Sequence, residues 1–132
     1  MRVGTHGSWT ADVPEGLTQL DNGDSWQAYD ERIVVYVSSL QIAGPDGVGP
    51  TRTEIAAVAA SDVPSGGDAE RLSFDSGTVI GQAAVAPAEG GWRLTGYAAA
   101  DGTLATCVVD FAHPDDRDHV EGIWRSLSVG HT

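Results

Sequence analysis

Apolar and polar residues alternate along much of the chain, which is the pattern of strands that bury one face of a sheet. The alternation is clearest in residues 33–40, where the odd-numbered positions share one face and the even-numbered positions the other. An aromatic and β-branched run over residues 26–29 precedes this segment, and Asp30-Glu31-Arg32 separates the two. The pair is therefore predicted to form a hairpin whose second strand is largely buried.

The N-terminal segment is predicted to hold one strand and a connection. Residues Val3 to Val13 alternate loosely and end at Pro14-Glu15-Gly16, a sequence typical of a strand end. Residues 18–24 contain Asn22-Gly23, a dipeptide that favours tight turns. We expect this second segment to be a turn-rich connection.

Two helices are predicted. Thr51-Arg52-Thr53-Glu54 has the form of a capping box and begins a helix over residues 52–61, with Ile55, Val58 and Ala59 expected to face inward. After Phe111 the apolar spacing changes to i, i+3, i+4, i+7, which predicts an amphipathic helix carrying Val120, Ile123, Trp124 and Leu127. Gly122 in this helix is expected to mark a close approach to the sheet.

Between the helices the sequence predicts a meander of strands. Asp101-Gly102 between two apolar runs is a strong hairpin signal. The four extended segments are 72–74, 78–86, 92–100 and 103–111. Residues 1–132 are thus predicted to form a single α+β domain: a mostly antiparallel sheet of about six to seven strands with two short helices, in the order β-β-β-α-β-β-β-β-α.

Charge and hydropathy narrow the possible partners. The formal net charge is −12, and all seven basic residues are arginines scattered along the sequence. Phosphate backbones and anionic membrane surfaces bind clustered positive charge, so neither nucleic acid nor a membrane is an expected partner. No apolar run approaches the roughly 20 residues of a membrane-spanning helix, and the N-terminus lacks the apolar region of a signal peptide. We expect a cytoplasmic location.

Two features are candidates for chemistry. Cys107 lies in an alternating apolar run and is expected to be a buried, unreactive thiol. Asp115, Asp116 and His119 are three and four residues apart, a spacing that can place metal ligands on one helical face. Acidic residues are also common at helix N-termini without any ligand, and that reading is the favoured one.

Four residues are candidate contacts for a partner. Trp26 and Tyr29 flank a predicted hairpin turn in a short strand that could lie at a sheet edge, where exposed aromatic side chains favour protein contacts. Pro45 and Asp46 belong to the Gly44 to Pro50 loop before the first helix. This loop lacks the residues of a phosphate-binding motif, so an ordinary connection or a partner contact is expected there.

The closing part of the chain carries a resemblance to known families. The strand Thr106 to Phe111, a short acidic connection and a helix with Trp124-Arg125-Ser126-Leu127 follow an earlier strand-rich half that contains Trp9. This succession resembles the Mog1/PsbP-like and DcrB-like families. The resemblance implies a non-enzymatic domain that binds a protein partner as an accessory factor or chaperone, and no catalytic residue is carried over from it.

The expected function is therefore that of an accessory module with an unidentified protein partner, no catalytic residues and no cofactor. Two alternatives remain open. One is a small-molecule- or metal-binding enzyme that uses the segment from His113 to His119. The other is a self-associating structural domain, and either a monomer or a homodimer is compatible with the sequence.

Overall fold

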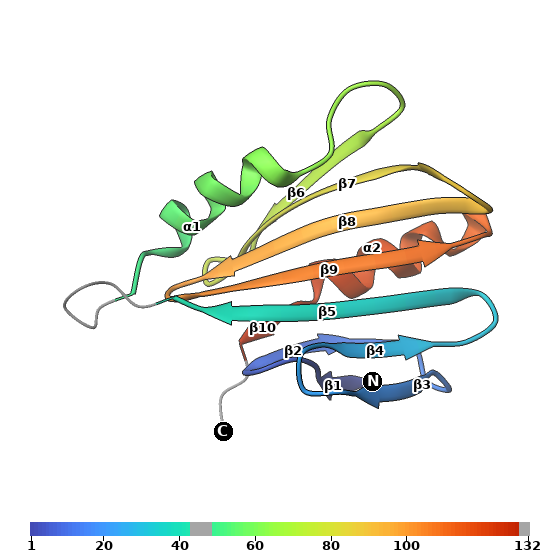
Figure 1. Ribbon diagram of the computed structural model, residues 1–132, viewed down its shortest axis with the longest axis horizontal. Helices are drawn as coiled ribbons and strands as arrows, with labels where there is room; N and C mark the ends of the chain where they lie inside the picture. Colours follow the sequence, from blue (N-terminus) through green and yellow to red (C-terminus); the bar gives the residue numbers. More distant parts are fainter. Residues whose placement is uncertain (43–48, 130–132) are drawn as a thin grey trace.

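The computed structural model describes residues 1–42 and 49–129, which fold into two antiparallel sheets and two α-helices (Figure 1). The larger sheet has seven strands in the order β3-β4-β5-β9-β8-β7-β6, and the smaller has three in the order β1-β2-β10. The strands are β1 Arg2–Gly4, β2 Trp9–Asp12, β3 Thr18–Asp21, β4 Trp26–Tyr29, β5 Ile33–Gln41, β6 Glu70–Asp75, β7 Ile80–Ala88, β8 Gly91–Ala100, β9 Thr103–Phe111 and β10 Ser128–Val129.

The helical segments follow the two predicted positions. α1 is Arg52–Ala59, followed by a 3-10 turn over Ala60–Asp62, and α2 is Arg117–Arg125, preceded by a 3-10 turn over Pro114–Asp116. The predicted α+β class, mostly antiparallel with two short helices, is confirmed. Neither helix in the described part of the chain is long and apolar enough to cross a lipid bilayer.

The core lies between one face of the larger sheet, α2 and the smaller sheet. Trp9 from β2 and Trp124 from α2 are both fully buried there, with Val35 and Val109 from the central strands. The indole N–H of Trp9 donates to the Thr103 hydroxyl at 3.0 Å, and that of Trp124 donates to the Tyr97 carbonyl oxygen at 3.2 Å. The four apolar residues predicted on the second helix are all buried, but Leu127 lies beyond the end of α2.

α1 packs on the opposite face of the larger sheet and covers only part of it. The capping box is present: the Thr51 hydroxyl accepts from the Glu54 N–H, and the Glu54 carboxylate accepts from the Thr51 N–H. Ile55 and Ala56 pack with Ala99 in a small second cluster, and the Gln82 side-chain amide donates to the Ala56 carbonyl at 3.1 Å. α1 contacts β7, β8 and β9, so this helix leaves the β4–β5 side of the face uncovered.

The N-terminal half differs from its prediction at two places. Residues 3–13 form a hairpin of β1 and β2 instead of one strand, because the chain turns at Gly7, whose φ of 61° is in the left-handed region that glycine tolerates. Residues 18–21 form the strand β3, which pairs with β4, instead of a connection. Five strands therefore precede α1 where three were predicted, and the short β10, which was not predicted, follows α2.

Two side chains on the helices were also placed wrongly. Val58 is 73% exposed, and Ala56 occupies the inward position in its place. Gly122 is exposed, and a methyl group built on it would meet nothing within 4 Å, so it does not mark a close approach to the sheet. The predicted hairpins at Asp30-Glu31-Arg32 and Asp101-Gly102 are both present.

Candidate functional site

The uncovered part of the larger sheet is the strongest candidate site, and we call it the open face. Its residues come from the even-numbered positions of β5 and from their cross-strand neighbours on β4 and β9. Tyr29 pairs with Val34, and Tyr36 lies between Gln27 and Val108. These pairings place the aliphatic and aromatic side chains of the three strands on one continuous surface.

Large apolar side chains on the open face are unusually exposed. Tyr29 is 41% exposed, Tyr36 39% and Leu40 63%. Such residues on one sheet face, instead of singly on scattered loops, are typical of surfaces that contact another molecule. The boundary with the α1-covered part lies near Tyr97, where burial, and then the nearby carboxylate of Asp62, raise the pKa of the phenol.

The two aromatic residues predicted as partner contacts are separated by the structure. Tyr29 points to the open face, whereas Trp26 is 3% exposed and belongs to the core. The prediction for Trp26 is wrong because β4 pairs on both sides, with β3 and β5, and residues 26 and 28 of this strand face the core. The other two predicted contacts, Pro45 and Asp46, lie outside the described residues.

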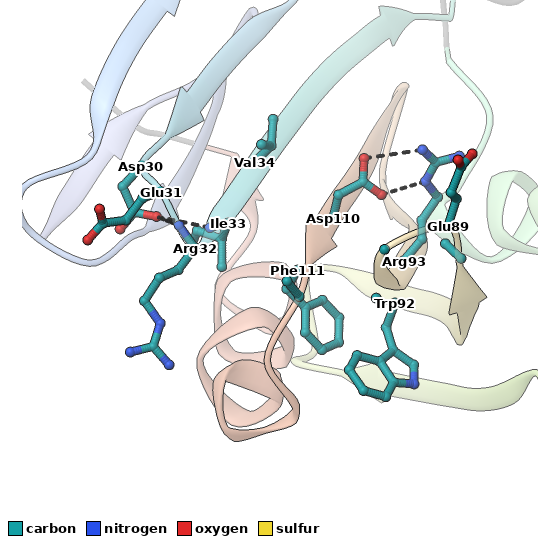
Figure 2. A pocket seen from close by; sticks show the side chains of 14 residues that line it. Asp30, Glu31, Arg32, Ile33, Val34, Glu89, Trp92, Arg93, Asp110 and Phe111 are labelled. Carbon is teal, nitrogen blue, oxygen red and sulfur yellow. Dashed lines mark hydrogen bonds and ion pairs between the residues drawn. The ribbon is translucent and has the colours of Figure 1, made fainter.

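A shallow depression adjoins the open face at one end of the sheet, between the β4–β5 turn and the β7–β8 turn (Figure 2). It measures about 560 Å³. The Trp92 and Phe111 rings stack beside each other with their centroids 6.0 Å apart. Gly91 is needed in this turn, since a methyl group there would lie 2.3 Å from the Phe111 carbonyl oxygen.

The rim of the depression is charged. Arg93 binds Asp110 through two hydrogen bonds, from Nε at 2.6 Å and from a terminal nitrogen at 3.2 Å, and this hydrogen bonding raises the pKa of the guanidinium (Figure 2). Asp30 accepts from the Arg32 and Ile33 backbone N–H groups and so fixes the β4–β5 turn. With Glu31 also on the rim, the depression is suited to receive a cationic or apolar side chain.

The predicted metal ligands are not gathered into a site. The Asp116 carboxylate is buried and binds Arg32 Nε at 2.9 Å, while Asp115 and His119 are exposed. The residues from 114 to 116 form a 3-10 turn, so Asp115 and His119 do not share one α-helix. Within residues 1–42 and 49–129 there is no group of three or more His, Cys, Asp or Glu side chains that could hold a metal ion.

The remaining chemical candidates have structural roles. Cys107 is a free, fully buried thiol, and burial raises its pKa to about 12, so it is a poor nucleophile. His6 joins three segments: Nδ1 accepts from the Ser39 N–H at 2.9 Å, and Nε2 lies 2.9 Å from the Gly23 carbonyl oxygen. Through these contacts the His6 ring braces the small sheet against β5 and the β3–β4 turn.

Several residues of the open face were not singled out by the sequence. The alternation in residues 33–40 placed Tyr36 and Leu40 on a common face, but a sequence alone does not say which face of a buried strand a helix will cover. The Arg93–Asp110 ion pair was not predicted either, because it depends on the β8–β9 register, which sets the two residues opposite each other.

Comparisons with known proteins bear on the fold and not on the site. No family model matches the chain, and no curated protein matches it. The fold is similar to a crystal structure from Bacteroides thetaiotaomicron VPI-5482, with a TM-score of 0.57 and 13% sequence identity, over 94% of this chain and 46% of that chain. The chain thus spans about half the length of that protein. At this identity the similarity shows a shared fold alone.

Proposed function

We propose that this protein is a non-enzymatic, cytoplasmic accessory module that binds a protein partner through the open face. The observation that carries the proposal is the exposure of Tyr29, Tyr36 and Leu40 on the part of the sheet that α1 leaves uncovered. Tyrosine is enriched at protein interfaces because it offers a large apolar ring together with a polar hydroxyl group. The resemblance to the Mog1/PsbP-like and DcrB-like families implies the same class of function.

The geometry of the open face favours a protein over a small molecule as its ligand. Small-molecule sites are enclosed and mostly apolar, with a few converging polar groups. The open face is instead a strand surface with a shallow, charge-rimmed depression at one end. A flat surface of this kind gains binding energy from a large contact area, which a folded partner or a long segment provides.

Affinity capture from the native host tests the proposal. The purified protein is immobilised, and bound proteins are quantified by mass spectrometry for the wild type, a Tyr29→Ser/Tyr36→Ser double variant and a Val58→Ser control. Val58 is the matched control because it is an exposed apolar residue on α1 that lies outside the open face. We expect a stoichiometric partner with the wild type and with the control, and its loss with the double variant.

Each other outcome is informative. Recovery of no stoichiometric protein under several growth conditions would count against a protein-binding role. Equal recovery with the wild type and with the double variant would place the contact elsewhere on the molecule. Circular dichroism of the three proteins establishes that the substitutions leave the fold intact, as expected for exposed positions.

A further inference from the structure

The two outer edges of the larger sheet differ in how they are protected. At the β6 edge, Arg125 of α2 donates to the Ser73 carbonyl oxygen at 3.1 Å, and Arg117 lies 2.7 Å from the Glu70 carboxylate. Side chains from α2 therefore occupy the edge where another strand could pair. Proteins commonly shield edge strands in this way, because exposed backbone groups are a template for pairing with another chain.

The β3 edge has no such protection in the part of the chain that the structure describes. β3 is the first strand of the order, so β4 is its only strand neighbour there, and all four of its side chains are exposed. Leu20 on this strand is 52% exposed. Its register with Gln27 places it beside the Tyr36 row, so the edge continues the open face.

The hydrogen-bonding pattern shows which backbone groups point outward. Asn22 and Ser25 form a hydrogen-bonded pair at the β3–β4 turn, because the Asn22 N–H donates to the Ser25 carbonyl oxygen. Along two antiparallel strands, opposed residues alternate between hydrogen-bonded and non-hydrogen-bonded pairs. Leu20 and Thr18 are consequently the residues bonded to β4, and the N–H and C=O groups of Gln19 and Asp21 point away from the sheet. No residue of 1–42 or 49–129 forms a hydrogen bond with these outward groups, which leaves them available to an added strand.

The opposite edge of the sheet shows the same alternation. The Ser76 N–H donates to the Val79 carbonyl oxygen at the β6–β7 turn, so the outward residues of β6 include Ser73. The Ser73 carbonyl is the group that Arg125 binds. The two edges thus present equivalent backbone groups, and at the β6 edge α2 binds one of them, the Ser73 carbonyl.

Charge indicates what kind of segment fits the β3 edge. Glu15 precedes the strand, Asp21 ends it and Asp24 lies in the following turn, and all three are exposed. Among the described residues none of these carboxylates is within ion-pair distance of an arginine. Six of the seven arginines are instead in ion pairs with other carboxylates: Arg2, Arg32, Arg52, Arg93, Arg117 and Arg125.

We infer that β3 is a docking edge for an extended segment of the partner protein in which lysine or arginine residues alternate with apolar ones. The segment adds a strand beside β3, with backbone hydrogen bonds to Gln19 and Asp21 and an apolar side chain against Leu20. Pairing with β3 of a second copy is disfavoured, since it would bring together the acidic edges of two chains that each carry a net charge of −12. The inference rests on the proposed function and names the chemistry of the partner.

A displayed library of random peptides tests the inference directly. The library is selected on the wild-type protein, and the enriched peptides are sequenced and then measured for binding to the wild type, Gln19→Pro and Ser73→Pro. Proline removes one outward N–H group in each variant without removing a hydrogen bond of the sheet. Ser73→Pro is the matched control, because it makes the same change at the edge that α2 covers.

The expected result has three parts. The enriched peptides alternate basic and apolar residues. Gln19→Pro weakens their binding by about tenfold, as expected for the loss of a backbone hydrogen bond between the peptide and β3, while Ser73→Pro leaves it unchanged. Hydrogen exchange of the wild-type protein shows new protection of the Gln19 and Asp21 amides when a peptide is bound. Because hydrogen exchange uses the wild-type protein, it tests the docking edge even if Gln19→Pro fails to fold.

Other results would overturn the inference. These are enrichment of no peptide, enrichment of peptides without basic residues, equal binding to Gln19→Pro, or no new protection at Gln19 and Asp21. A wild-type dimer in sedimentation that Gln19→Pro abolishes would identify a second copy as the occupant instead. If the partner captured from the host is lost with Tyr29→Ser/Tyr36→Ser but kept by Gln19→Pro, the docking edge is wrong and the proposed function stands.

Discussion

Gly96 on β8 faces the ring of Trp124 on α2, and the space between them is too small for another carbon atom. A methyl group on Gly96 would lie 2.7 Å from Trp124 Cδ1 and 3.2 Å from the Ala83 methyl group. The indole is fixed from the other direction too, because its N–H donates to the Tyr97 carbonyl oxygen at 3.2 Å. The position of α2 on the sheet therefore depends on this glycine.

Gly96→Ala is expected to lower the free energy of unfolding by about 1–3 kcal/mol, as overpacking does in a well-filled core. The matched substitution is Gly122→Ala on α2, where the methyl group would meet nothing within 4 Å. In that helix alanine is expected to raise the free energy of unfolding by about 0.5–1 kcal/mol. Urea denaturation of the three proteins measures both changes, and the same sign for both would contradict the packing described.

The buried thiol makes stability depend on pH in the alkaline range. Burial raises the pKa of Cys107 to about 12 in the folded protein, against 9.0 for an ordinary cysteine thiol. Above pH 9 the unfolded chain releases this proton and the folded chain keeps it, so the free energy of unfolding falls as pH rises towards 12. The slope due to this group is at most about 1.4 kcal/mol per pH unit.

Cys107→Ala is expected to lack this part of the pH dependence. The variant is less stable at neutral pH because it leaves a small cavity, but its loss of stability between pH 9 and pH 11 is shallower than that of the wild type. Urea denaturation at a series of pH values provides the comparison. Parallel curves for the two proteins would show that the thiol is not buried in the way described.

Single residues also show the limit of sequence reasoning. Trp26 and Tyr29 lie on one short strand and have similar apolar character, yet one is in the core and the other is exposed. Their three-residue separation puts them on opposite faces of a strand, and which face is buried depends on the position of α2 and of the smaller sheet. That information is in the tertiary structure, so the sequence offered both residues as contacts.

At the scale of elements, strong local signals in the sequence were sufficient to predict helices and hairpins. The capping box, the Asp-Gly turn and the 3.6-residue period of α2 each predicted an element that is present. The elements that the sequence did not predict are short strands with weak alternation of apolar and polar residues. β3 has four exposed side chains and hence no alternation, and it exists because it pairs with β4. The β1–β2 turn was missed because its flanking residues continue the alternation of the two strands.

Thr51→Ala tests the contribution of the capping box to α1. The hydroxyl satisfies the Glu54 N–H group, one of the donors that a helix start leaves without an intrahelical partner. We expect the free energy of unfolding to fall by about 1 kcal/mol. Thr53→Ala is the control, since Thr53 is exposed inside the helix and alanine there is expected to be neutral or stabilising. A loss with Thr53→Ala equal to that with Thr51→Ala would rule out a capping effect.

For the molecule as a whole, the two helices cover the larger sheet unequally. α2 and the smaller sheet bury one face, whereas α1 covers a corner of the other. The α+β class followed from the sequence pattern, but the open face did not, because it results from how little of the sheet α1 covers. The similarity to the Bacteroides structure supports the architecture and assigns no activity.

In the folded molecule, part of the negative charge of the chain has a defined position. Six of the seven arginines bind carboxylates within the protein, so the surface at the β3–β4–β5 side carries negative charge beside its apolar residues. A partner with basic and apolar residues fits such a surface through both steering and burial. The charge and the open face thus indicate the same kind of ligand.

The most direct test of the account places a photo-crosslinker on the open face. Tyr36 is replaced by p-benzoylphenylalanine in one protein and Val58 in another, and each is irradiated in extract of the native host. Binding through the open face predicts a crosslinked species of defined mass at position 36, which an excess of unlabelled wild-type protein abolishes, and none at position 58. The absence of a specific adduct at position 36, or equal adducts at both positions, would contradict the account.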